Sequence, residues 1–141
     1  MDSFEEVIDV LTRKVREFFE KAKGRSVIIQ THNVPDPDAL ASAEAMRIIA
    51  RSFGFHAKII SYGLSYRREN NAMIKECKIP LKQLNSVKIL QPSKVAWIYI
   101  DCIPGGGNVK LHSQAPGDLY MAIDHHGRFV RDTLTKKGFV F

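Results

Sequence analysis

Three short stretches of this 141-residue sequence combine histidine and aspartate, and each of them follows a run of apolar residues. Both residue types can bind a divalent cation or transfer a proton. The first stretch holds one histidine and two aspartates, the second a single aspartate, and the third an aspartate followed by two histidines. The seven residues are His32, Asp36, Asp38, Asp101, Asp124, His125 and His126.

The elements that must position these residues are predicted strands and helices in alternation. Apolar, β-branched runs indicate buried strands, and apolar residues spaced three and four apart indicate amphipathic helices. The strands are expected at 27–29, 57–62, 95–100 and 119–123. The helices are expected at 3–22, 39–53 and 66–77. Ser3 with Glu6 resembles a capping box, residues 78–93 are expected to be irregular, and 138–141 resembles an interrupted strand.

Strands alternating with helices predict an α/β fold, with a mostly parallel sheet flanked by helices on both faces. In such a sheet the carboxyl ends of the strands lie along one edge, where ligands bind. The three stretches are therefore expected to meet there, with four carboxylates and three imidazoles. So many acidic groups repel one another unless cations neutralise them. We expect Mn²⁺, Fe²⁺, Zn²⁺ or Mg²⁺, with two ions sharing a bridging carboxylate.

Each residue also has an ordinary structural interpretation. Asp38 could be only the N-cap of the helix that follows, and Asp36 could form an Asx-turn before Pro37. His32 after a strand, and Asp101 before a proline–glycine turn, are typical of turns. Adjacent histidines also occur by chance. These interpretations weaken because all of them would have to hold together at the ends of three predicted strands.

Other chemistries explain less of the sequence. The triple glycine at 105–107 could hold a phosphate through backbone amides, although a flexible turn is favoured. P-loop and dinucleotide-binding motifs do not occur. Cys102 could be a thiolate ligand, but a small buried apolar residue is favoured. A glycosyltransferase that uses Asp36 and Asp38 would leave the two adjacent histidines unexplained.

Composition limits the function classes further. The length fits one domain spanning 1–141. A formal net charge of +6 suits phosphate-rich partners such as nucleotides, oligonucleotides or polyphosphate. The longest apolar run, 95–100, is far shorter than the ~20 residues of a membrane helix. The acidic start argues against a signal peptide, and Cys77 and Cys102 form no CxxC pair. We expect a soluble cytoplasmic protein without a membrane partner.

The three stretches resemble the motifs of a known superfamily. Residues 27–42 are similar to the first motif of the DHH phosphoesterase superfamily, residues 98–101 to the second, and residues 122–126 to the third, which gives the superfamily its name. The order and context of the motifs also match across a core at 24–128. A lone DHH tripeptide would be weak evidence, whereas the three motifs together are specific.

This resemblance implies a hydrolase that prefers manganese. Its members include single-strand exonucleases, nano-RNases, cyclic-dinucleotide phosphodiesterases, inorganic pyrophosphatases and exopolyphosphatase-like proteins. The implied activity is hydrolysis of phosphoester or phosphoanhydride bonds in short oligonucleotides, nucleotides or polyphosphate. The implied cofactors are two divalent ions, Mn²⁺ preferred and Mg²⁺ possible, which activate the attacking water.

The resemblance also implies a role for each residue. His32 and Asp36 would bind one metal ion, Asp38 and His125 would bind the second, and Asp101 would bridge the two. His126 would contact the scissile phosphate, and Asp124 would support the site from behind.

One departure from the superfamily concerns the carboxyl-terminal side. Its members usually add another aspartate ligand and a second, substrate-binding domain downstream, whereas only 15 residues follow His126 here. We therefore expect a single catalytic domain without that partner domain. The sequence does not identify which phosphate ester is the substrate. The alternative is a catalytically weak or inactive module that binds nucleotide or nucleic acid. A homodimer is also left open.

Overall fold

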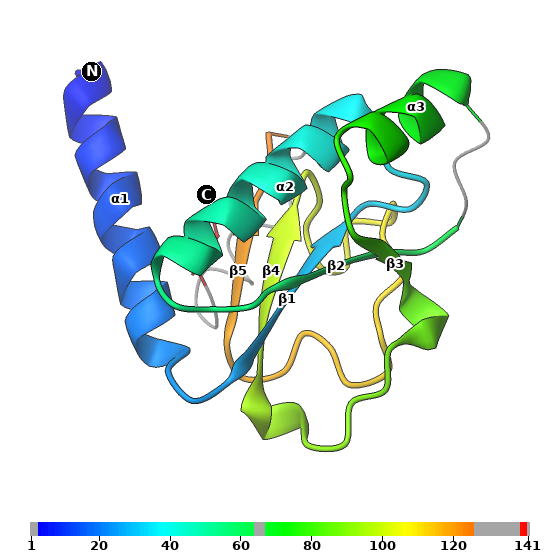
Figure 1. Cartoon of the computed structure of the whole chain (residues 1–141). Helices are drawn as coiled ribbons and strands as arrows, with labels where there is room; N and C mark the ends of the chain where they lie inside the picture. Colours follow the sequence, from blue (N-terminus) through cyan, green and yellow to red (C-terminus); the bar gives the residue numbers. More distant parts are fainter. Residues whose placement is uncertain (1–2, 64–66, 126–138, 141) are drawn as a thin grey trace.

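The computed structural model describes residues 3–63, 67–125 and 139–140. Its centre is a six-stranded sheet in the order β3-β2-β1-β4-β5-β6, and every neighbouring pair is parallel (Figure 1). The strands are β1 (Ser26–Thr31), β2 (Lys58–Ser61), β3 (Leu81–Gln83), β4 (Val95–Ile100), β5 (Tyr120–Ile123) and β6 (Phe139–Val140). The helices are α1 (Phe4–Lys21), α2 (Pro37–Ser52) and α3 (Arg68–Glu76), with two 3-10 helices, η1 (Leu84–Ser86) and η2 (Pro92–Lys94). The predicted α/β class, a parallel sheet flanked by helices, is confirmed, but the described α-helices lie on one face of the sheet rather than on both.

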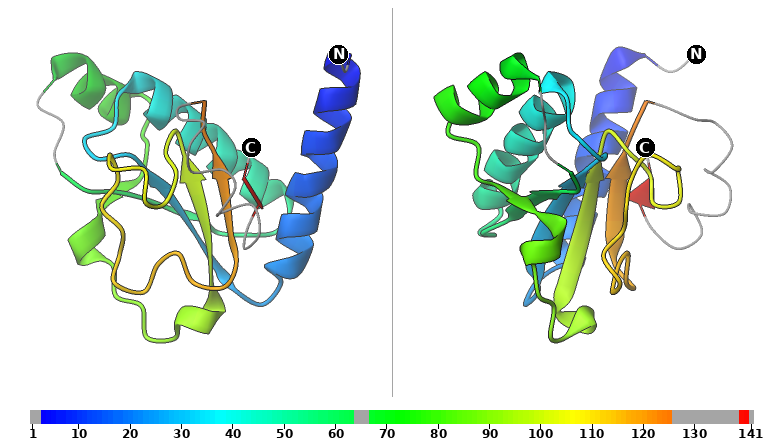
Figure 2. Two further views of the ribbon diagram at one scale, coloured as in Figure 1. Left: turned by 180° about the vertical axis from the view of Figure 1, so that it is seen from behind. Right: turned by 90° about the vertical axis from the view of Figure 1, so that its right-hand side faces the viewer.

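The three α-helices lie on one face of the sheet (Figure 2). Small residues at the start of α2, such as Ala39 and Ala43, are fully buried and let this helix approach the sheet closely. Phe18 and Phe19, near the C-terminal end of α1, are buried in the same core. Strand β4, which is buried along its whole length, contributes Ile98 to this face. The apolar run predicted from the sequence is therefore the central strand, as expected for a strand covered on both faces.

The other face of the sheet is covered differently. In the described part of the chain, η1 and loop segments pack over Trp97 and Tyr99 of β4. The loop side chains in this layer are Val87, Ile89, Val109, Leu111 and Ala115. No α-helix is described between β4 and β5, because Pro104, three glycines and Pro116 interrupt that connection.

The element boundaries agree with the sequence predictions to within about two residues, with one exception. The segment 78–93, predicted to be irregular, contains β3 and both 3-10 helices. Strand β3 has only three residues, too few for a period-2 pattern to be recognised. It pairs with β2 in parallel at the edge of the sheet, directly after Pro80, where a proline is tolerated.

Helix α1 begins and ends as its sequence predicts. The Ser3 side chain accepts from the Glu6 backbone N–H at 3.2 Å, while the Glu6 carboxylate accepts from the Ser3 N–H at 2.7 Å. Gly24, with φ of +78°, lets the chain turn into β1. Beyond it, Arg25 donates two hydrogen bonds to Asp118, which holds the pKa of that carboxyl below its usual range. Among the described helices, none combines the length and the apolar character needed to cross a bilayer.

Candidate metal centre

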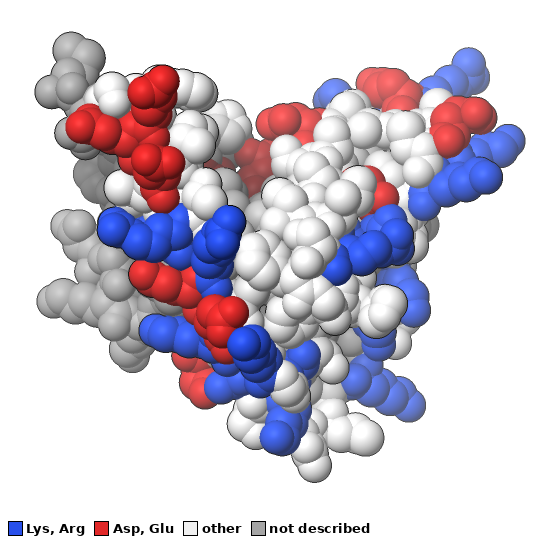
Figure 3. Space-filling view, turned by 60° about the vertical axis from the view of Figure 1, so that its left-hand side comes forward, with Lys and Arg blue, Asp and Glu red and all other residues white. Residues whose placement is uncertain are grey.

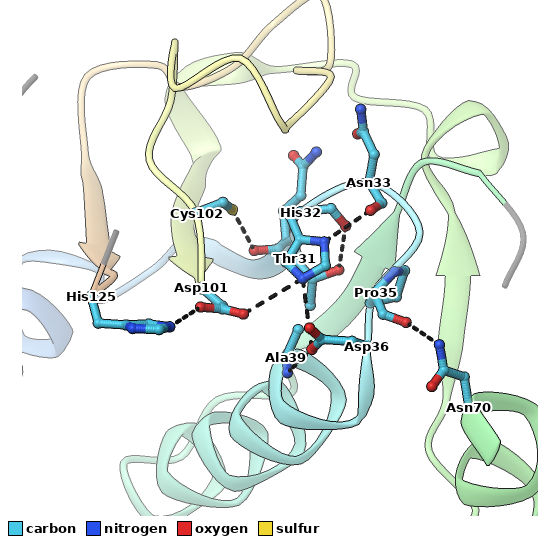
Figure 4. Close-up of polar contacts among 11 residues, drawn as sticks. Thr31, His32, Asn33, Pro35, Asp36, Ala39, Asn70, Asp101, Cys102 and His125 are labelled. Carbon is cyan, nitrogen blue, oxygen red and sulfur yellow. Dashed lines mark hydrogen bonds and ion pairs between the residues drawn. The ribbon is translucent and has the colours of Figure 1, made fainter. Parts of the chain in front are cut away.

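His32 is the first residue after β1 and lies at the carboxyl edge of the sheet (Figure 4). Its Nδ1 is 2.9 Å from the backbone carbonyl oxygen of Asn33. A carbonyl oxygen can only accept, so this contact requires the proton on Nδ1 and leaves Nε2 as the acceptor of the neutral ring. Nε2 faces two carboxylates, at 3.7 Å from Asp36 and 3.5 Å from Asp101. Histidines that bind metals are commonly oriented in this way by a carbonyl on their other nitrogen.

Asp36 has a structural role as well as a place in this cluster. It is the N-cap of α2, and its Oδ1 accepts from the Ala39 N–H at 2.9 Å. Pro37 occupies the first helical position, where its missing N–H costs nothing. Asp38 lies in the first turn of the helix. The N-cap interpretation considered for Asp38 is therefore wrong, and it applies to Asp36 instead.

The loop between β1 and α2 is fixed by hydrogen bonds to two other segments, one at 108–110 and one at Tyr62. The Asn33 N–H donates to the Asn108 carbonyl at 2.8 Å, and the Asn33 side chain accepts from the Lys110 N–H at 2.8 Å. The Val34 N–H donates to the Tyr62 carbonyl at 2.9 Å. Val34 has a φ of +50°, which is costly for a β-branched residue. The loop therefore holds His32 and Asp36 in place at some cost in backbone strain.

Asn70 of α3 supports the same loop from below. Its side chain is 1% exposed, and its amide donates to the Pro35 carbonyl at 3.0 Å (Figure 4). A buried amide is costly unless its polar atoms are bonded, so this contact joins α3 to the loop specifically. Sequence reasoning missed both Asn33 and Asn70. Asn33 follows a motif histidine and could have been noticed, whereas nothing near Asn70 in the sequence points to the loop.

Asp101 lies at the centre of the cluster. Asp101 is 7% exposed and directly follows β4. Its backbone N–H donates to the Ile123 carbonyl at 2.9 Å. Its φ of +57° is left-handed, a conformation that aspartate tolerates better than most residues. One carboxylate oxygen lies 3.5 Å from His32 Nε2, and the other lies 3.1 Å from His125 Nε2. A single buried carboxylate thus lies between two imidazoles, as a bridging ligand would.

Two groups of potential ligands share Asp101. The first is His32, Asp36 and Asp101, and the second is Asp38, Asp101 and His125. Within each group, one ligand atom from every residue lies within 4.8 Å of the others. Ligands about 2.0–2.2 Å from one ion lie at most about 4.4 Å apart, so each group needs only a small contraction. With neutral histidines the facing atoms are all acceptors, and a cation would satisfy them together. The donor set therefore fits divalent ions.

Cys102 and the triple glycine do not take part in either group. Cys102 is fully buried, with its Sγ 3.7 Å from the Gln30 carbonyl, and burial raises the pKa of its thiol. It therefore behaves as the small buried residue favoured by the sequence. Both cysteines are free. In the glycine segment, the Gly106 N–H donates to the Ile103 carbonyl at 2.8 Å, as in a turn.

Five of the seven residues predicted for the site are brought together, and they are His32, Asp36, Asp38, Asp101 and His125. Asp124 is buried beside them but belongs to neither group. His126 lies outside the described residues, so its contact with a phosphate stays a prediction.

A groove opens beside this cluster, between α1 and α2 (Figure 3). Its volume is about 680 Å³, and its walls are mostly apolar. Asp38, Asp101, Asp124 and His125 lie at its end on the carboxyl edge of the sheet. The cluster therefore forms one end of the groove.

Comparison with known proteins adds one relative of undetermined activity. No family model matches the chain. The uncharacterized protein MJ1633 of Methanocaldococcus jannaschii is 31% identical over 107 residues, which are 76% of this chain. Those residues are 21% of the relative, so the chain spans about a fifth of its length. The chain is thus similar to part of a much longer archaeal protein, and this similarity indicates no activity.

Proposed function

We propose that this chain is a metal-dependent phosphoesterase domain that hydrolyses phosphoester or phosphoanhydride bonds. The observation that carries the proposal is the position of Asp101, whose two carboxylate oxygens face His32 on one side and His125 on the other. The orientation of the His32 ring supports the proposal as well, because its Nδ1 contacts the Asn33 carbonyl and its Nε2 faces two carboxylates. The resemblance of three separate motifs to the DHH phosphoesterase superfamily supports the same activity.

In this proposal, each residue has a role that follows from its place. Asp101 would be shared by two ions, His32 and Asp36 would complete the first ligand set, and Asp38 and His125 would complete the second. When bound there, divalent ions, Mn²⁺ by resemblance, would supply a water-derived nucleophile at neutral pH and would neutralise charge on the phosphoryl group. The buried Asp101 keeps the two sets in one geometry, and the loop at 33–36 keeps His32 turned toward them.

The proposed substrates are phosphate-containing, either short oligonucleotides, nucleotides or polyphosphate. The net charge of +6 favours such polyanions. The proposed compartment is the cytoplasm, because the exposed Cys77 and the buried Cys102 are both free, as in a reducing environment.

A comparison of two exposed histidines tests the activity. The chain is stripped with EDTA, supplied with Mn²⁺, and assayed on a 5′-phosphorylated dinucleotide, a nucleoside triphosphate and tripolyphosphate. We expect hydrolysis of at least one of them. His125→Ala should reduce its rate at least about 100-fold, because a ligand of the site is lost. The matched control, His56→Ala, removes an exposed histidine before β2, at the opposite edge of the sheet, and should leave the rate unchanged.

Two results would contradict the proposal. One is a wild-type chain that hydrolyses none of the three substrates with Mn²⁺, and the other is a His125→Ala variant as active as the control. A module that only binds is the second candidate, and the 70% exposure of the His125 side chain favours it, because a loosely held second ligand set weakens catalysis. Calorimetric titration separates the two, since the binding module would take up Mn²⁺ or nucleotide without turnover.

A further inference from the structure

Helix α1 is packed against the protein over only half of its length. Its C-terminal residues Phe18 and Phe19 are buried in the core. Its N-terminal half continues the same apolar stripe at three- and four-residue spacing, but there Phe4 is 80% exposed and Val7 and Ile8 are each 44% exposed. Large apolar side chains gathered on one exposed stripe usually mark an interaction surface.

The exposed stripe borders the groove described above. Val7, Leu11 and Val15 of α1 form one wall of the groove, and Met46 and Ile49 of α2 form the opposite wall. The two helices diverge toward the N-terminus of α1 (Figure 1). An incoming helix with an apolar stripe would therefore find apolar side chains on both sides, as in a helix bundle.

The charges along α1 indicate which helix fits there. Its charged residues up to Asp9 are all acidic, whereas from Arg13 on the basic residues outnumber the acidic ones. The acidic residues of the first half are Glu5, Glu6 and Asp9, and the second half carries Arg13, Lys14, Arg16 and Lys21 together with Glu17 and Glu20. Figure 3 shows a group of acidic side chains near the N-terminus of α1 and basic side chains mixed with acidic ones farther along. An antiparallel copy of the same helix would place acidic side chains beside basic ones and oppose the helix dipoles. A parallel copy would place like charges together.

We propose that the groove between α1 and α2 receives helix α1 of a second copy of this chain, in an antiparallel, two-fold symmetric dimer. Such an interface is isologous, so that each contact occurs twice. It does not depend on the proposed activity, because its contacts are made along α1 and α2 and need no metal ion.

One pair of residues defines the register. At ~100° per residue, Glu5 and Arg16 lie about 100° and 120° round α1 from Phe4, on the same flank of the stripe. In an antiparallel pair this flank meets its own copy, so Glu5 of one chain lies beside Arg16 of the other. Both side chains are exposed, and no ion pair is formed by either one within the described part of the chain.

Charge reversal tests this arrangement. Sedimentation equilibrium of the full chain should show a dimer, and Glu5→Arg or Arg16→Glu should each raise its dissociation constant about tenfold or more, since two attractive pairs become repulsive. An equimolar mixture of the two variants should restore wild-type affinity, because the mixed dimer regains opposite charges at both pairs. Arg13→Glu is the matched control, since Arg13 lies ~180° from Phe4 and its reversal should leave the constant unchanged.

The same measurements can overturn the dimer. A wild-type chain that sediments as a monomer at every concentration would exclude it. A mixture that associates no more tightly than its two components would exclude the antiparallel register, as would an Arg13→Glu effect equal to that of Arg16→Glu. Circular dichroism checks that all variants stay folded. We expect that they do, because the substituted side chains are exposed.

Discussion

The two ligand groups that share Asp101 differ in how firmly the fold holds them. In the first, the His32 side chain is 15% exposed, its Nδ1 donates to the Asn33 carbonyl, and Asp36 is fixed as the N-cap of α2. In the second, Asp38 is exposed on the first turn of the helix, and the His125 side chain is 70% exposed. The first group is built into the structure, whereas the second depends on side chains that face solvent.

This difference teaches that two ions need not be held equally. Ligands that are already oriented lose little conformational entropy when they bind, whereas exposed side chains must be ordered at that moment. We therefore expect the His32 group to bind its ion more tightly than the His125 group. The second ion would then be the one whose occupancy limits activity at low metal concentration.

The largest expected effect comes from the residue that the two groups share. Asp101→Asn removes the bridging charge and should weaken the binding of both ions at least about 100-fold, since loss of a residue that only orients a ligand already costs about 10–100-fold. Calorimetric titration with Mn²⁺ measures it. Asparagine also tolerates the φ of +57°, so the fold should be kept. Tight binding of either ion by this variant would contradict the shared role.

The two histidines test the comparison directly. His32→Ala should lower the affinity for the more tightly bound ion at least about 100-fold, because it removes a ligand that the fold holds in place. His125→Ala should leave that ion bound with nearly wild-type affinity, whereas binding of the second, more weakly held ion should be abolished. The number of Mn²⁺ ions bound per chain at equilibrium distinguishes the variants. Equal losses in both variants would break the comparison, because the groups would then be equally organised.

Asn33 tests what holds the first group together. Its carbonyl accepts from the His32 ring, and its side chain ties the loop to the Lys110 N–H. Asn33→Ala removes the side-chain bond alone and should loosen that carbonyl, so the tighter ion is expected to bind about tenfold more weakly. The weaker ion should be unaffected. Asn85→Ala, an exposed asparagine in η1, serves as the matched control and should change neither ion.

The sequence predicted the fold and the meeting of the ligands because both depend on periodic patterns. Apolar runs marked the central strands, and the rule that parallel strands end at one edge brought His32, Asp101 and His125 together. What it could not predict depends on contacts between distant segments. The hydrogen bond from Asn70 to the Pro35 carbonyl joins α3 to the β1–α2 loop, and Val34, which has a left-handed φ, donates its N–H to the Tyr62 carbonyl. Neither contact leaves a local pattern in the sequence.

The choice of N-cap shows the same limit on a smaller scale and provides the smallest predicted effect. Asp36 directly precedes α2, and Asp38 lies in its first turn. Only the backbone conformation determines that Asp36 is the residue that accepts from the Ala39 N–H. Asp36→Asn keeps an N-cap of nearly equal quality, whereas Asp36→Ala should lower the free energy of unfolding by about 1 kcal/mol more. Urea denaturation without metal measures this difference. Because both variants lose the same carboxylate ligand, their Mn²⁺ affinities should fall together. A weaker Mn²⁺ affinity for Asp36→Ala than for Asp36→Asn would contradict this and would show that the cap also orients the first group.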